Sequence, residues 1–124
     1  MSKRILIVED QEDNRAILRD LLTANGLAYI EAADGQQGVE LAEREQPDLI
    51  LMDIQLPVVD GYEATRRIKA NPALRAIPVI AVTSYALSGD EAKAKASGCD
   101  AYVTKPFSPR LLLAKVREFL PEDD

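Results

Sequence analysis

The stretch Leu49-Ile50-Leu51-Met52-Asp53 decides the fold, because four apolar residues run without interruption and end on a carboxylate. A continuous apolar run is typical of a strand that is covered on both faces, as in a parallel sheet. Four similar runs lie before and after it in the chain, at residues 5–8, 28–30, 79–82 and 101–103. These five runs are the expected strands.

Segments with helical spacing lie between the expected strands and after the last one. Their apolar stripes are residues 17, 18, 21 and 22, a weaker set at 39, 41 and 42, and residues 111, 112, 116, 119 and 120. Asn25-Gly26 and Ser97-Gly98 are typical C-terminal caps, and prolines 47, 72 and 121 follow the other helices, which they cannot continue. Five βα units joined by right-handed crossovers predict an α/β fold with a doubly wound, five-stranded parallel sheet.

The fourth expected helix, at about residues 89–97, differs from the others in its apolar residues, which are nearly all alanine. Such a helix buries little area and should be loosely held. It is either a short surface helix or a mobile element of a switch, which requires low local stability.

The composition restricts the function further. The chain has 124 residues, enough for one domain, and its net charge of −6 gives it no general attraction for nucleic acid. It has no histidine, which excludes histidine-based catalysis within the chain, and its one cysteine, Cys99, fits a reducing compartment. No apolar run approaches the ~20 residues that span a bilayer. We therefore expect a cytoplasmic protein that neither binds DNA or RNA directly nor inserts into a membrane.

Residues with reactive or charged groups follow four of the expected strands. Ligands of open α/β sheets bind beyond the carboxyl ends of the strands, where the winding direction reverses. In the strand order 3-2-1-4-5 the acids after the first and third strands would be separated, whereas in the order 2-1-3-4-5 these strands are neighbours, about 5 Å apart. The second order brings the polar groups together and is the one we expect; these groups are Glu9, Asp10, Asp53, Thr83 and Lys105.

Three crowded carboxylates repel one another and require a cation. All-oxygen ligands with room for water suit Mg²⁺. A metal alone does not explain Lys105, whereas a Mg²⁺ site that also receives a phosphoryl group does. There the ammonium would neutralise phosphoryl oxygens, a hydroxyl would donate a hydrogen bond, and one carboxylate would be the nucleophile. Taken singly, each residue has a simpler explanation, such as a helix cap or a surface charge.

With these residues in place, the chain resembles a known family, the receiver domains of bacterial two-component response regulators, from residue 4 to residue 120. The resemblance rests on five segments in this order and spacing: Ile5-Leu6-Ile7-Val8-Glu9-Asp10, Leu49-Ile50-Leu51-Met52-Asp53-Ile54-Gln55-Leu56-Pro57, Asp60-Gly61-Tyr62-Glu63, Ala81-Val82-Thr83 and Lys105-Pro106-Phe107. More narrowly, the chain is similar to the single-domain regulators of the DivK type. This likeness implies one receiver domain over residues 1–124, with no attached output domain.

The resemblance also implies the roles of the site residues. Asp53 would be the phosphorylated residue, and Asp10, Asp53 and the backbone carbonyl of Gln55 would bind Mg²⁺ directly, with Glu9 acting through water. Thr83 and Lys105 would contact the phosphoryl group, and Tyr102 would be the aromatic that moves with Thr83. The donor would be a phosphohistidine on a sensor histidine kinase or a histidine phosphotransfer protein. The fourth helix, fifth strand and fifth helix would form the face that binds a downstream protein.

We also expect a cis bond between Lys105 and Pro106. A sharp turn there would keep the Lys105 ammonium aimed at the acidic pocket, and proline is the residue at which a cis bond costs little. Ser84, which follows Thr83, is small enough to leave the phosphoryl group access.

Four alternatives fit the sequence less well. A haloacid dehalogenase-type hydrolase needs a second acid two residues after the nucleophile, where this chain has Gln55. A flavodoxin needs a Ser/Thr/Gly-rich phosphate loop after the first strand, where the chain carries acidic residues instead. A dinucleotide-binding fold needs a Gly-x-Gly-x-x-Gly turn, which is absent. A receiver fold that only scaffolds would not require the full set of acids, Thr83 and Lys105.

Overall fold

The structure, a computed structural model, describes residues 3–83, 90–105 and 108–120, in which five strands form one parallel sheet. The order is β2-β1-β3-β4-β5, which confirms the expected topology. The strands are β1 (Arg4–Val8), β2 (Ala28–Ala32), β3 (Leu49–Asp53), β4 (Val79–Thr83) and β5 (Ala101–Thr104). The helices are α1 (Glu12–Ala24), α2 (Gly35–Glu45), α3 (Gly61–Ala70), α4 (Asp90–Ser97) and α5 (Pro109–Phe119).

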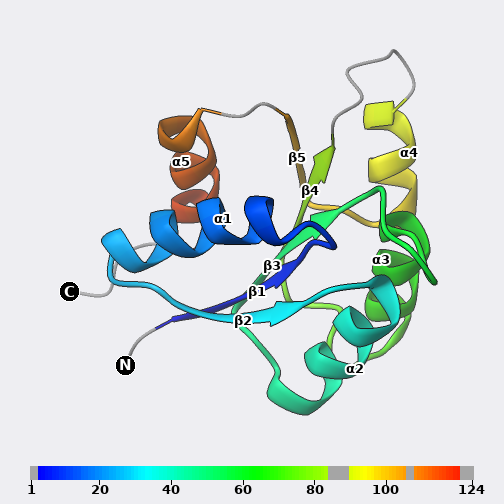
Figure 1. Cartoon of the computed structure of the whole chain (residues 1–124). Coiled ribbons are helices and arrows are strands. Elements are labelled where there is room, and N and C mark those ends of the chain that lie inside the picture. The colour runs from blue at the N-terminus through cyan, green and yellow to red at the C-terminus, as the bar shows by residue number, and fades with distance from the viewer. Residues whose placement is uncertain (1–2, 84–89, 106–107, 121–124) are drawn as a thin grey trace.

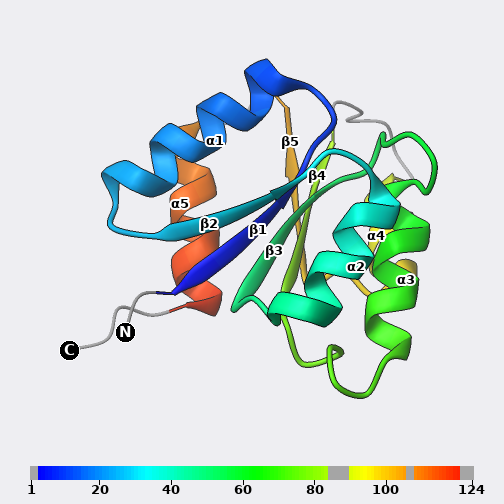
Figure 2. The same ribbon diagram turned by 60° about the horizontal axis from the view of Figure 1, so that its bottom comes forward.

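The helices form two layers, one on each face of the sheet. Helices α1 and α5 cover one face, and α2, α3 and α4 cover the other (Figures 1 and 2). Strands β3 and β4 are buried along their whole length, as their continuous apolar runs predicted.

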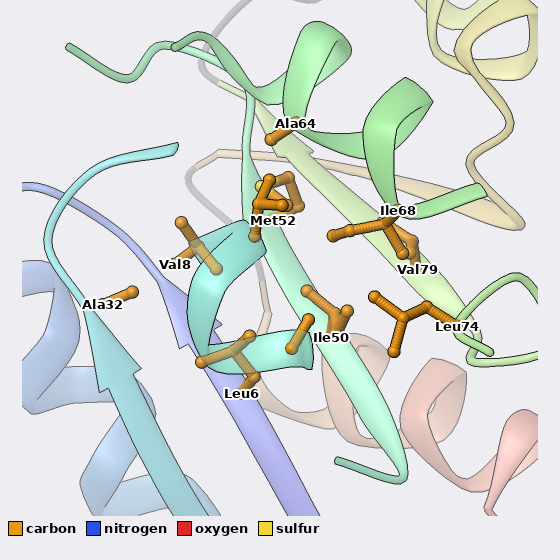
Figure 3. Close-up of a cluster of buried hydrophobic side chains, with 11 residues drawn as sticks. Leu6, Val8, Ala32, Ile50, Met52, Ala64, Ile68, Leu74 and Val79 are labelled. Carbon is orange, nitrogen blue, oxygen red and sulfur yellow. The ribbon is translucent and has the colours of Figure 1, made fainter. Parts of the chain in front are cut away.

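Each face of the sheet contributes to its own hydrophobic cluster, because successive side chains of a strand point to opposite faces. Figure 3 shows the cluster between the sheet and helices α2 and α3, to which the sheet contributes Leu6, Val8, Ile50, Met52 and Val79, among others. Towards α1 and α5 it directs Ile5, Ile7, Leu49, Leu51 and Ile80, which pack on Leu18, Leu22, Leu112 and Val116. The two clusters hold the strand ends in place, and these ends carry the polar residues.

Two residues of the expected apolar stripes lie on the surface. Ile17 of α1 is 53% exposed and Leu111 of α5 is 64% exposed, while their neighbours Leu18 and Leu112 are buried. Each is at the edge of its stripe, so the helix turns it away from the sheet. Helix α4 has only a small buried set among its described side chains, Ala94 and Ser97, in keeping with its alanine-rich sequence.

No helix in the described ranges is both long enough and apolar enough to span a bilayer.

Candidate functional site

The register of the sheet brings the acidic residues of two strands side by side. Val8 pairs with Met52 in the β1–β3 ladder, so the next residues, Glu9 and Asp53, lie level with each other. One carboxylate oxygen from each of Glu9, Asp10 and Asp53 lies within 4.8 Å of the others. The acidic pocket expected at the carboxyl edge of the sheet is therefore present.

Glu9 is almost completely buried, with 2% of its surface exposed, and both its backbone and its carboxylate are hydrogen-bonded. Its backbone N–H donates to the Ala32 carbonyl at 3.0 Å, and its Oε2 accepts from the Gln11 backbone N–H at 3.0 Å. Asp10 is exposed at the mouth of the pocket. Partial burial, together with the hydrogen bond and negative charge of Glu9, raises the pKa of Asp10 above its ordinary value of 3.8.

Asp53 is the last residue of β3 and is only 4% exposed. Its Oδ1 accepts a hydrogen bond from the Gln55 backbone N–H at 3.1 Å. This contact folds the chain back over the carboxylate, so the Gln55 peptide lies beside the acidic pocket.

Lys105 reaches into the pocket from the end of β5. Its Nζ lies 2.7 Å from Glu9 Oε1 and 3.3 Å from Asp53 Oδ2, and only 17% of the side chain is exposed. Its backbone N–H donates to the Thr83 carbonyl at 2.6 Å, which fixes the start of the side chain. Burial alone would lower the pKa of Lys105, but the hydrogen bond with Glu9 and the charges of Asp53 and Glu9 outweigh it and raise the pKa.

Thr83 and Tyr102 come from the neighbouring strands. Thr83 ends β4 and is completely buried, and its strand neighbour Val82 pairs with Asp53. Tyr102 of β5 is half-buried and packs against the small cluster around Ala81. The structure thus brings Glu9, Asp10, Asp53 and Lys105 into contact and places Thr83 at the same edge. Ser84, Pro106 and its predicted cis bond lie outside the described residues.

Two glycines hold the loop between β3 and α3 by close packing, which the sequence did not reveal. The Gly61 backbone N–H donates to the Ile54 carbonyl at 2.9 Å, and a methyl group on Gly61 would lie 2.2 Å from the Asp53 carbonyl oxygen. A methyl group on Gly35, the first residue of α2, would lie 1.8 Å from the Val59 carbonyl oxygen. The loop that carries Gln55 therefore packs against backbone at both positions, where only glycine fits.

Arg15 of α1 is a further residue that sequence reasoning missed. Its Nη1 donates to the backbone carbonyl of Glu9 at 2.8 Å. Nothing in its position along α1 distinguishes it from Arg19, one turn later, and the contact becomes visible only when α1 is packed on the sheet.

The donor set fits a hard divalent cation. When Glu9, Asp10 and Asp53 are all ionised, the Lys105 ammonium leaves two negative charges uncompensated, since 3 − 1 = 2. Carboxylate oxygens within one coordination sphere of each other are the ligands that Mg²⁺ and Ca²⁺ prefer. The residues present therefore could hold a magnesium ion.

The chain also matches known proteins in sequence. The model of the family described as response regulator receiver domain matches residues 5–117. The polar-differentiation response regulators DivK of Brucella ovis and of Brucella abortus are each 45% identical to it over 120 residues, which is 97% of this chain and 98% of theirs.

Solved structures share its fold. The receiver domain of the sensor histidine kinase PA1611 from Pseudomonas aeruginosa, solved with a magnesium ion coordinated in its active site cleft, has a TM-score of 0.91 and 38% identity. The match covers 98% of this chain and all of that one. The receiver domain of Ssk1 from Saccharomyces cerevisiae, solved in complex with the histidine phosphotransfer protein Ypd1, has a TM-score of 0.88 and 33% identity, with 95% of this chain and 88% of that one covered.

Proposed function

This chain belongs to the response regulator receiver domain family, and on that premise we propose that it accepts a phosphoryl group on Asp53 and acts as a phosphorylation-dependent switch. The observation that carries the proposal is the Lys105 ammonium, which lies between the carboxylates of Glu9 and Asp53. When a buried carboxylate with a lysine beside it accepts a phosphoryl group, the ammonium can neutralise the negative charge of the phosphorylated product.

In the proposed reaction, a carboxylate oxygen of Asp53 attacks the phosphorus of a phosphohistidine on a sensor histidine kinase or a histidine phosphotransfer protein. An O–P bond forms as the P–N bond breaks, and the imidazole leaves with the electron pair of that bond. The Gln55 N–H on Oδ1 orients the carboxylate, and Lys105 stabilises the charge on the transferred group. The chain contributes this catalysis itself, and the same site would support its dephosphorylation by water.

We propose that Mg²⁺ is held directly by Asp10, Asp53 and the Gln55 carbonyl, and through water by Glu9. When bound, the ion supplies positive charge that offsets the phosphoryl oxygens and the crowded carboxylates. The magnesium ion in the PA1611 receiver domain supports this assignment, as does the fit of the three carboxylates.

We propose that Thr83 and Tyr102 couple phosphorylation of Asp53 to a change at the surface formed by α4, β5 and α5. Thr83 would donate its hydroxyl to a phosphoryl oxygen, and Tyr102 would follow its movement. A cavity of about 560 Å³ lies along β5 and α5, and its lining includes Tyr102, Thr104 and the exposed Leu111. Such an apolar hollow on the face next to the site suits a downstream protein.

The proposed partners follow from this chemistry. The complex of a related receiver domain with Ypd1 supports a histidine phosphotransfer protein, or the corresponding domain of a kinase, as donor. We propose that the receiver unit spans residues 1–124 and signals by binding another protein. The single cysteine is consistent with a cytoplasmic location.

Phosphorylation of the intact chain by a small phosphodonor tests the proposal. The protein is incubated with acetyl phosphate and Mg²⁺, and its intact mass is measured. A gain of one phosphoryl group that is absent in Asp53→Asn and in the sample without Mg²⁺ is expected. Asp48→Asn, a change of another carboxylate that lies at the opposite end of the sheet, serves as the control and should still be phosphorylated. An unmodified wild-type protein, or equal labelling of Asp53→Asn, would overturn the proposal.

A further inference from the structure

Arg15 is the residue that connects α1 to the acidic pocket. Its side chain is only 17% exposed, and its guanidinium contacts three groups. Nη1 donates to the Glu9 backbone carbonyl at 2.8 Å, Nη2 lies 2.6 Å from Glu12 Oε2, and Nε lies 3.4 Å from Glu31 Oε1. These contacts fix the orientation of the guanidinium, because a planar group that is bonded through all three of its nitrogens has little freedom to rotate.

The Glu9 carbonyl belongs to the peptide bond that joins Glu9 to Asp10. A rotation of this peptide plane would redirect the start of both residues, and both contribute carboxylates to the pocket. Glu9 lies one residue beyond the end of β1; its backbone N–H still donates to the Ala32 carbonyl, while its backbone carbonyl accepts from Arg15. The contact with Arg15 is therefore placed where it can determine the direction of the two carboxylates.

We propose that Arg15 is a positioning residue for the metal site: by holding the Glu9 carbonyl, it keeps Glu9 and Asp10 in the geometry that binds Mg²⁺. The inference rests on the proposed function, since it assumes that the acidic pocket binds the ion. Partners of this kind, which orient ligands without touching the metal, commonly change affinity by about 10- to 100-fold when they are removed.

Arg19 provides a matched control. It lies one turn after Arg15 and contacts the same two glutamates, with Nη2 2.8 Å from Glu12 Oε1 and Nη1 2.7 Å from Glu31 Oε1. Within the described part of the chain, no hydrogen bond joins Arg19 to Glu9. Arg15→Gln and Arg19→Gln thus remove the same charge from the same ion-pair network, and only the first removes the bond to the Glu9 carbonyl.

The sign of the effect separates positioning from simple electrostatics. Loss of a positive charge near a cation site should strengthen Mg²⁺ binding, so Coulomb forces alone predict tighter binding in both variants. A role in positioning predicts the opposite for Arg15→Gln. The Arg15 and Arg19 side chains are similarly buried, at 17% and 25% exposed, and glutamine keeps part of the aliphatic chain of each, so both variants are expected to fold.

Calorimetric titration of the two variants and the wild type with MgCl₂, at one ionic strength, tests the inference. We expect Arg15→Gln to bind Mg²⁺ about tenfold more weakly than the wild type, at the lower end of the range above. Arg19→Gln should bind it as tightly as the wild type or more tightly. If the two variants bind Mg²⁺ equally, Arg15 is not a positioning residue, although the metal site stands. If the wild type itself does not bind Mg²⁺, the proposed metal site and this inference both fail.

Discussion

The ammonium of Lys105 lies closer to Glu9 than to Asp53, at 2.7 Å from Glu9 Oε1 and 3.3 Å from Asp53 Oδ2. The lysine therefore already neutralises part of the charge of the pocket before any cation or phosphoryl group arrives. Its position also means that it must share the carboxylates with a metal ion. A positive charge that stabilises the metal-free fold should then oppose metal binding.

Replacement of Lys105 should reveal this competition. Lys105→Gln removes the short charged hydrogen bond to Glu9 and the longer one to Asp53. One bond of this kind typically contributes about 1.5–3 kcal/mol, so the free energy of unfolding of the metal-free protein should fall by about 2 kcal/mol or more. The affinity for Mg²⁺ should rise, because the repelling charge is gone. Chemical denaturation in chelator and titration with MgCl₂ measure the two quantities.

Lys115→Gln is the control for the loss of charge. Lys115 lies on α5 with its side chain 45% exposed and pairs with Glu118 on the surface. Surface pairs of this kind contribute little, so neither stability nor Mg²⁺ affinity should change appreciably. Weaker Mg²⁺ binding in Lys105→Gln would show that the lysine does not compete with the ion.

Asp10→Asn should stabilise the metal-free protein at neutral pH. Because the pKa of Asp10 is raised in the folded protein, the fold disfavours the ionised form of this residue. The resulting loss of stability is absent below the pKa that Asp10 has in the unfolded chain, and it develops as the pH rises through the pKa of the folded protein. The advantage of Asp10→Asn over the wild type should therefore vanish in acid, below about pH 4. Urea denaturation at several pH values, in low salt with chelator, gives the comparison.

Asp20→Asn controls for the change in net charge, since Asp20 is an exposed residue of α1 outside the pocket. The repulsion among the three carboxylates, considered alone, would favour the same stabilisation for Asp53→Asn. The structure argues against it, because Asp53 accepts from the Gln55 N–H and lies beside Lys105, and both interactions would be weakened. An Asp10→Asn protein that is less stable than the wild type at pH 7 would mean that Asp10 is paired rather than crowded.

The topology and the acidic pocket could be predicted because both depend on the simplest properties of the strands. Uninterrupted apolar runs such as residues 49–52 mark parallel strands, and a parallel sheet delivers the residues that follow them to one edge. The strand order followed from requiring Glu9 and Asp53 to meet, and the β1–β3 register shows that they do.

The supporting contacts could not be predicted, because they depend on how the helices dock on the sheet. Arg15 and Arg19 are equivalent in the sequence of α1, and only packing directs Arg15 to the Glu9 carbonyl. Gly35 resembles an ordinary residue at the start of a helix until the Val59 carbonyl is seen against it. Likewise, the apolar stripes did not show that Ile17 and Leu111 would remain exposed.

Gly35→Ala should disturb the loop between β3 and α3. The added methyl group would lie 1.8 Å from the Val59 carbonyl oxygen, so the backbone must move, and overpacking of this kind costs about 1–3 kcal/mol. Gly38→Ala, in the same helix, is the control: its methyl group would lie 3.0 Å from the Val8 methyl groups, which need to give only slightly. Thermal denaturation should therefore show a markedly lower Tm for Gly35→Ala than for Gly38→Ala. Equal values would mean that the loop shifts at no cost.

Val58 lies in the same loop with a positive φ, and its replacement by glycine should stabilise the fold. Its φ of +69° is rare for a β-branched side chain, and the Val59 N–H donates to the Pro57 carbonyl at 2.8 Å in a tight turn centred on Val58. The side chain is 80% exposed, so little packing is lost. Relief of strain of about 1–3 kcal/mol should exceed the added entropy of a glycine in the unfolded chain, roughly 0.5–1 kcal/mol.

Val58→Ala separates backbone strain from the loss of the side chain. Alanine keeps the Cβ atom that disfavours positive φ, so it should gain much less than glycine. Urea denaturation of the metal-free proteins should place Val58→Gly above the wild type by about 1 kcal/mol, with Val58→Ala between them. At an unstrained exposed position glycine would instead lower stability, and that order of the three proteins would show that the turn at Val58 stores no strain.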